Sequence, residues 1–77
     1  MNKNRRKMIR KIVEQLGGLK EELDSVKDEE QEALDSMPEN LQESERGEEM
    51  QKAIDVMEDA CGDLESIVYN LEEMLEG

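Results

Sequence analysis

The sequence contains no histidine, tryptophan or phenylalanine, and its 77 residues include one cysteine, one proline and one tyrosine. The lack of histidine excludes His-based catalytic triads and, together with the single cysteine, zinc fingers and haem sites. One cysteine cannot form an internal disulfide, which excludes a disulfide scaffold and fits a reducing compartment. A chain this short buries only a small fraction of its surface, so we expect it to need a partner, most simply another copy of itself.

Long hydrophobic runs are also absent. No apolar run approaches the ~18 residues that a membrane-spanning helix needs. The N-terminus is basic, like the start of a signal peptide, but Arg10, Lys11 and Glu14 interrupt the segment that follows it. We therefore predict a cytoplasmic protein without a membrane anchor.

The first half of the chain carries a heptad pattern. Its apolar residues alternate in steps of three and four, with Glu30 in one of the positions. They are Ile9, Ile12, Leu16, Leu19, Leu23, Val26, Ala33 and Met37. This spacing is typical of a helix packed along another helix. A carboxylate at such a position either reaches solvent near a bundle end or specifies one alignment of the helices.

The second half carries a wider apolar stripe. Two rows alternate in steps of three and four, and they comprise Met50, Ala53, Met57, Ala60, Leu64, Ile67, Leu71 and Met74. A third row at seven-residue spacing comprises Ile54, Cys61, Val68 and Leu75. Two rows are enough for one partner helix, so a third row suits a helix inside a bundle. We predict an interface between copies formed by Ile54, Met57, Cys61, Leu64, Val68, Leu71 and Leu75.

The two helices are separated by clear break signals. Pro38 cannot lie deep inside a helix, and Ser44 is a good N-cap that is followed by acidic residues. We place the first helix at about residues 4–35, a connector at 36–44 and the second helix at about 45–75. A short connector folds the helices back on each other. The expected fold is all-α, one domain over residues 1–77 that forms an antiparallel, coiled-coil-like hairpin and pairs with a second hairpin as a four-helix bundle.

The charge is distributed unevenly along the chain. The first eleven residues hold six basic and no acidic residues, whereas the other 66 hold four basic and 22 acidic ones, which gives +6 and −18 within a net charge of −12. The basic arm, which includes Arg5, Arg6 and Arg10, has three interpretations. It pairs with the acidic end of the second helix and sets register, it binds a small anion such as a nucleotide, or it contacts a membrane surface. The acidic remainder repels an extended nucleic-acid duplex.

Interior glycines and the lone thiol are further candidate features. Gly17 and Gly18 cost a helix about 2 kcal/mol relative to alanine. They predict a hinge, a break into two helices, or close approach of a ligand or partner. Cys61 has no histidine to activate it and is interpreted as a small buried hydrophobe.

The acidic stretch at 28–35 lacks the alternating ligands and central glycine of a calcium loop, so we predict no metal, no cofactor and no catalytic residue.

The connector region resembles that of a known group of proteins. The run Pro38-Glu39-Asn40-Leu41-Gln42-Glu43-Ser44-Glu45-Arg46-Gly47-Glu48, followed by Ala53-Ile54 and a heptad helix, is its recognisable part. It is similar to small acidic two-helix proteins encoded by phages and mobile elements of Gram-positive bacteria. The resemblance implies a phage-type accessory protein in the host cytoplasm, of the kind that blocks host defence by binding a host protein or sequestering a signal molecule. It supplies no active residues.

Four functions remain open at this point. The leading hypothesis is a non-catalytic binding protein that inhibits host defence through a protein–protein surface, since its negative field would speed association with a basic partner. The first alternative is an oligomer that sequesters a small anionic nucleotide with Arg5, Arg6, Arg10 and the backbone of Gly17 and Gly18. The second is a DNA mimic, whose carboxylates imitate phosphates. The third is a structural or assembly factor.

Overall fold

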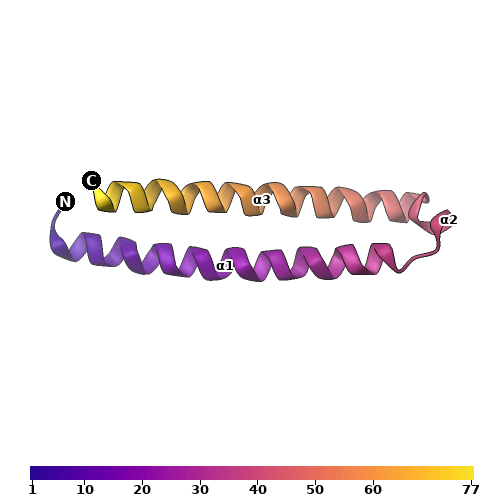
Figure 1. The fold of residues 1–77 in the computed structure, drawn as a ribbon, viewed down its shortest axis with the longest axis horizontal. Helices are drawn as coiled ribbons and strands as arrows, with labels where there is room; N and C mark the ends of the chain where they lie inside the picture. The colour runs from indigo at the N-terminus through magenta and orange to yellow at the C-terminus, as the bar shows by residue number, and fades with distance from the viewer.

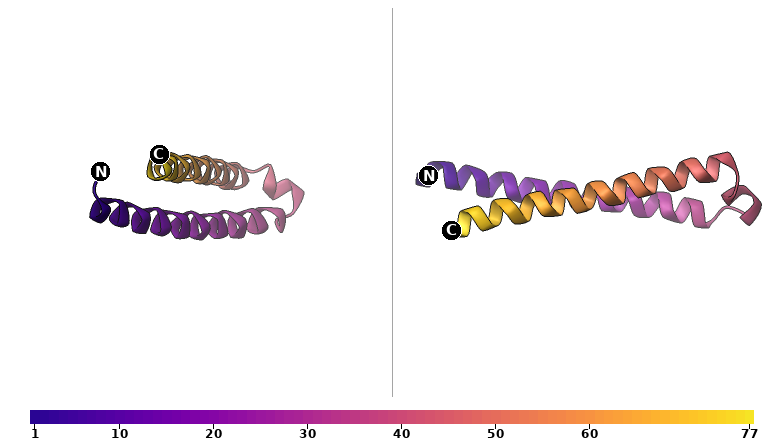
Figure 2. Two further views of the ribbon diagram at one scale, coloured as in Figure 1. Left: turned by 60° about the vertical axis from the view of Figure 1, so that its left-hand side comes forward. Right: turned by 90° about the horizontal axis from the view of Figure 1, so that it is seen from above.

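A computed structural model describes all 77 residues as a helical hairpin (Figure 1). Helix α1 spans Lys3–Asp35, the single turn α2 spans Glu39–Gln42, and α3 spans Glu45–Glu76. The two long helices run antiparallel, so both termini lie at one end of the rod and α2 lies at the other. The view from above in Figure 2 shows α3 crossing α1 near the middle of the rod. This confirms the prediction of an all-α hairpin. The rod measures 58 × 14 × 13 Å between Cα extremes.

Side-chain caps define where the long helices begin. The Asn2 side chain accepts a hydrogen bond from the Arg5 backbone N–H at 2.9 Å, and the Ser44 hydroxyl accepts one from the Gly47 N–H at 3.4 Å. Each bond satisfies an amide that has no partner inside the helix. Pro38 precedes α2 with φ −57° and ψ 147°, an extended conformation that separates the C-cap of α1 at Ser36 from the single turn α2. The Gln42 amide group donates to the Met37 carbonyl at 2.9 Å and ties the connector together.

The seam between α1 and α3 is a regular heptad in both helices. Every residue in it is buried or half-buried. In α1 and the bend that follows it, the seam comprises Ile9, Val13, Leu16, Lys20, Leu23, Lys27, Glu30, Leu34 and Met37. In α3 it comprises Gly47, Met50, Ile54, Met57, Cys61, Leu64, Val68, Leu71 and Leu75. The hairpin therefore has one seam, which in α1 includes three charged side chains.

Both helices are rotated by one row from the predicted alignment. In α1 the predicted seam residues Ile12, Leu19 and Val26 are exposed, and Lys20 and Lys27 lie at seam positions instead. In α3 the row of Ile54 faces inward. The connector explains this rotation, because Gly47 is buried against the carbonyls of Leu41 and Gln42. Residues at seven-residue steps from Gly47 share its face of the helix and are turned inward with it.

Glu30 lies in the seam as predicted, and it is half-buried. Replacing it with leucine is expected to stabilise the hairpin by about 1 kcal/mol, because a partly hydrated carboxylate is exchanged for apolar contact. A change of this size raises the melting temperature of a small domain by roughly 4–8 °C. Circular dichroism melts at equal protein concentration measure it, with Glu29→Leu as the exposed control. An unchanged or lower melting temperature for Glu30→Leu would contradict this expectation.

Candidate functional site

The basic arm contacts the end of α3 through Arg6. The Arg6 guanidinium donates a hydrogen bond from Nη1 to the Leu75 carbonyl oxygen at 2.6 Å. The last carbonyls of a helix have no partner within it and form the negative end of the helix dipole, so a cation is stabilising there. The basic arm forms no ion pair with a carboxylate, because the two ion pairs in the molecule join Asp24 to Lys20 and to Lys27. Arg6 therefore joins the chain ends by capping the backbone of α3.

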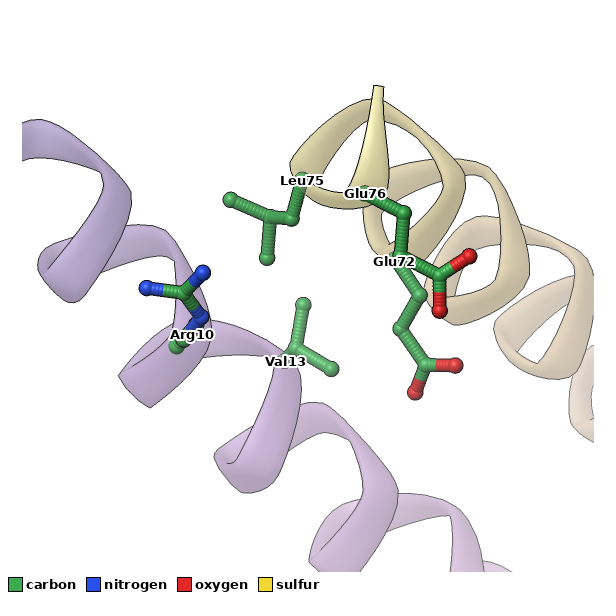
Figure 3. Close-up of a pocket in the computed structure, with 5 residues that line it drawn as sticks. All are labelled: Arg10, Val13, Glu72, Leu75 and Glu76. Atoms are coloured by element: carbon green, nitrogen blue, oxygen red, sulfur yellow. The ribbon is translucent and has the colours of Figure 1, made fainter. Parts of the chain in front are cut away.

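Arg10 lies in a surface groove close by (Figure 3). The groove is lined by Arg10 and Val13 from α1 and by Glu72, Leu75 and Glu76 from α3. One guanidinium thus faces two carboxylates across the groove, an arrangement that disfavours a bound anion. Arg5 is exposed, and Gly17 and Gly18 do not line this groove. The residues proposed from the sequence for an anion site are not gathered into one pocket.

Removing the Arg6 cap is expected to destabilise the hairpin. Arg6→Gln is expected to lower the free energy of unfolding by about 1 kcal/mol, because the Leu75 carbonyl loses a half-buried, charge-assisted hydrogen bond. Arg5→Gln is the matched control, since it removes the same charge from an exposed neighbour. Urea unfolding followed by circular dichroism measures both variants. Equal losses in the two variants would show that only net charge matters and would contradict the capping role.

Gly17 and Gly18 have no packing role within this chain. An added Cβ at either residue would meet no atom within 4 Å, apart from the adjoining helix backbone. Helix α1 also continues without interruption from Lys3 to Asp35, so the predicted break at these residues does not occur. The two glycines leave an open stretch of helix surface.

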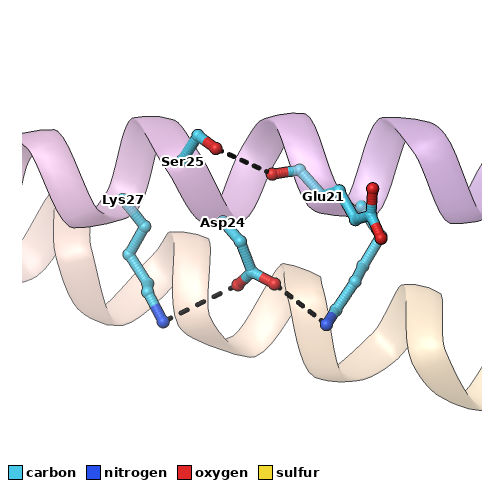
Figure 4. A network of polar contacts seen from close by, with 5 residues as sticks. Glu21, Asp24, Ser25 and Lys27 are labelled. Carbon is cyan, nitrogen blue, oxygen red and sulfur yellow. Dashed lines mark hydrogen bonds and ion pairs between the residues drawn. The ribbon is translucent and has the colours of Figure 1, made fainter.

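Asp24 organises the polar centre of the rod (Figure 4). Its carboxylate lies 2.9 Å from the Lys20 ammonium and 3.7 Å from that of Lys27. The hydrogen bond from Lys20 lowers the pKa of Asp24, and the same contact raises the pKa of Lys20. Both lysines come from seam positions, so Asp24 neutralises two of the three charged side chains that α1 contributes to the seam. The sequence pattern did not reveal this cluster, although i,i+4 and i,i+3 spacing links the three residues.

Cys61 packs beside this cluster from α3 and is 5% exposed. Burial raises the pKa of its thiol, and the neighbouring Asp24 carboxylate raises it further. Both effects keep the sulfur protonated, whereas a nucleophilic cysteine needs a lowered pKa. The side chain is a small buried hydrophobe, in agreement with its interpretation from the sequence.

The structure places the seven residues predicted to join two copies inside one hairpin. Ile54, Met57, Cys61, Leu64, Val68, Leu71 and Leu75 all lie in the seam of a single hairpin. The expectation that the row of Ile54 and Cys61 is left free by a two-helix contact is wrong, because both side chains are buried by α1. The inward rotation imposed at Gly47 is the physical reason.

The rotation leaves a different surface open, which we call the apolar face. It consists of the row beside the seam in each helix: Ile12, Leu19, Val26 and Ala33 from α1, and Ala53, Ala60, Ile67 and Met74 from α3. The large side chains among them are 40–55% exposed. A contiguous exposed apolar patch on a small protein marks an interaction surface.

The rows on the other side of the seam are polar. They comprise Arg10, Gly17, Asp24 and Gln31 in α1, and Gln51, Glu58, Glu65 and Glu72 in α3. Because Arg10 and Glu72 line one groove, the polar rows of both helices share one side of the hairpin and the apolar rows share the other. We call the first of these sides the acidic face, after the exposed carboxylates Glu58, Glu65 and Glu72.

Two further observations concern metal and membrane binding. No cluster of three or more histidine, cysteine, aspartate or glutamate side chains has the arrangement needed to hold a metal ion. None of the helices has the length and apolar character needed to cross a bilayer.

Comparison of the chain with protein-family models, with curated proteins and with solved structures finds no match in any of the three. The arguments for function therefore rest on the two faces of the hairpin.

Proposed function

We propose that this chain is a non-catalytic binding protein that acts through protein–protein contact, in the manner of a counter-defence inhibitor encoded by a phage or mobile element. The observation that carries the proposal is the acidic face. Glu58, Glu65 and Glu72 stand in an exposed row along α3, in a chain whose net charge is −12. The partner this surface suits is a host protein with a basic surface.

The acidic face is well built for recognition at long range. Residues seven apart on a helix are separated by ~10 Å, so the three carboxylates form a rigid, evenly spaced row. Such a field steers a basic partner toward the face and raises the association rate. Each exposed charge contributes about 0.5 kcal/mol to binding, so the row supplies orientation and speed more than affinity.

The proposal is tested by neutralising the row. The triple variant Glu58→Gln, Glu65→Gln, Glu72→Gln is compared with Glu32→Gln, Asp59→Asn, Glu73→Gln, which removes three exposed charges from the outer surface of the helices. Each protein is immobilised and used to capture partners from a lysate of a Gram-positive bacterium at low and high salt. We expect the first variant to lose about tenfold in captured partner and the control to retain it. Equal capture by both variants would overturn the proposal.

Each alternative function predicts a different result in the capture experiment or in a thermal melt. If the acidic face mimics DNA, added duplex DNA displaces the captured protein, with strong salt dependence. A nucleotide sequesterer would instead gain thermal stability with its ligand. The carboxylates of Glu72 and Glu76 beside Arg10 weigh against that function. A purely structural factor would capture only further copies of itself.

A further inference from the structure

The isolated hairpin buries very little of its apolar surface. Four of 77 residues are buried, and one of the four is Gly47. At the same time α1 directs Lys20 and Lys27 into the seam and leaves the wholly apolar row of Ile12, Leu19 and Val26 exposed. A domain of this size rarely supplies enough stability from one small core, and oligomerisation is a common remedy.

We infer that the apolar face is the surface on which a second copy of this chain packs, and that the two hairpins lie antiparallel. The end with the termini in one hairpin would then contact the connector end of the other. This inference does not depend on the proposed function, because the acidic face lies on the opposite side and stays free for a partner. Three features of the apolar face support it: its gradient of side-chain size, the charge of its two ends, and its length.

Side-chain size decreases along the apolar face. In the antiparallel hairpin Arg6 lies opposite Leu75, and Asp24 lies beside Cys61. With this alignment, the residues of the apolar face form four pairs, or levels, along the rod. From the termini to the connector these levels are Ile12 with Met74, Leu19 with Ile67, Val26 with Ala60, and Ala33 with Ala53. Large side chains therefore occupy the end with the termini, and small ones occupy the connector end.

In the antiparallel pair, the two hairpins are related by a two-fold axis that lies in the interface and runs across the rod. This symmetry places the large side chains of one copy on the small side chains of the other. Leu19 then packs against the partner's Val26, and Ile12 packs against the partner's Ala33. Alternation of large and small residues across facing positions fills a core without voids or overlap. The parallel arrangement would put Ile12 on the partner's Met74 and leave only alanines at the other end, which creates both overpacking and a cavity.

The charges of the two ends favour the same orientation. The connector end, residues 28–52, holds ten acidic and two basic residues, which gives −8. The end with the termini, residues 1–14 and 64–77, holds six basic and five acidic residues, which gives +1. A parallel pair would bring two strongly negative ends together, whereas the antiparallel pair separates them and places the basic arm near the partner's connector.

The length of the apolar face suits an extended contact. The rod is 58 Å long between Cα extremes, and the rows of the apolar face run from Ile12 and Met74 near the termini to Ala33 and Ala53 near the connector. Two hairpins aligned along their full length would thus form a four-helix core.

The first test measures mass in solution by light scattering and sedimentation at tens of micromolar. We expect twice the 8.9 kDa chain mass for the natural protein. Leu19→Glu with Ile67→Glu is expected to halve this mass, because it places charges at the centre of the face. Ser25→Glu with Ser66→Glu adds the same charge on the outer surface and is expected to leave the mass unchanged. A folded natural chain of 8.9 kDa would overturn the inference, as would a Leu19→Glu, Ile67→Glu protein that keeps the doubled mass.

The second test reads the orientation of the two copies from disulfide cross-linking. In a Cys61→Ala background, Ile12→Cys with Ala33→Cys is expected to form a disulfide-linked dimer on mild oxidation. These two positions lie ~32 Å apart along one helix, so they meet only between antiparallel copies. Ile12→Cys with Glu32→Cys is the control, because Glu32 faces away from the apolar face and is expected to give little cross-linking. Equal cross-linking of the two variants, or none in the first, would overturn the antiparallel pairing.

Discussion

Replacing Ile54 with glutamate is expected to unfold the hairpin. Ile54 is 4% exposed and lies in the seam, at the level of the half-buried Glu30. The change removes ~2–5 kcal/mol of apolar packing and adds the cost of a buried, unpaired carboxylate. A domain of 77 residues has a total stability of only ~4–12 kcal/mol. The helical circular dichroism signal at 25 °C is therefore expected to fall to that of an unfolded chain.

Val56→Glu is the matched control for this experiment. It places the same charge two residues away in α3, at a side chain that is 67% exposed. We expect this variant to keep its helical signal. An Ile54→Glu protein that stays helical and merely separates into single chains would show that Ile54 lies between copies, as the sequence pattern had suggested, and would contradict its place in the seam.

The second large effect is expected at Gly47. A Cβ added there would lie 2.7 Å from the Leu41 carbonyl oxygen and closer still to the carbonyl of Gln42. Backbone cannot move aside as a flexible side chain can, so the connector would have to shift. Gly47→Ala is expected to destabilise the hairpin by about 2 kcal/mol, even though alanine favours helices by ~1 kcal/mol over glycine.

Gly17→Ala tests the same substitution where no atom crowds the site. It is expected to stabilise the hairpin by about 0.5–1 kcal/mol, because it reduces the freedom of the unfolded chain. Urea unfolding of the two variants side by side should therefore give effects of opposite sign. Stabilisation by both would mean that the connector does not hold Gly47 tightly. If Gly17→Ala were stabilised but lost binding, a partner contact would be assigned to that stretch.

Local signals made the helices and their ends predictable. Heptad spacing indicates long packed helices, and Pro38 and Ser44 mark the break between them through effects that act within a few residues. The rotation of the helices was not predictable in the same way. In α3 an apolar row lies on each side of the row of Met50, Met57, Leu64 and Leu71, so steps of three and four can be followed along either side. In α1 the exposed row of Ile12, Leu19 and Val26 is fully apolar whereas the seam row includes Lys20 and Lys27, so apolar periodicity selects the exposed row. Gly47 decides between them through contact with Leu41 and Gln42, and its place near the end of the connector was the one signal available.

The candidate site was predicted less completely for a related reason. The basic arm was expected to meet the acidic end of α3, and Arg6 does reach that end. Its acceptor is a backbone carbonyl, and every residue has one, so composition cannot distinguish it from a carboxylate. The cluster of Lys20, Asp24 and Lys27 was missed because a search for apolar periodicity passes over lysines. Their long alkyl chains can pack in a seam while the ammonium groups reach its edge.

The positions of the buried residues have a consequence for how the rod opens. Leu34, Gly47, Ile54 and Cys61 are buried, and none of them lies among residues 1–33 or 62–77. Local unfolding follows the distribution of buried contacts, so amide hydrogen exchange should be fastest at the termini and slowest near the connector. Refolding should proceed in the reverse direction, because residues next to the connector close the smallest loop and lose the least chain entropy. A molecule that holds the two chain ends together would therefore slow exchange in the first turns of α1 and the last turns of α3.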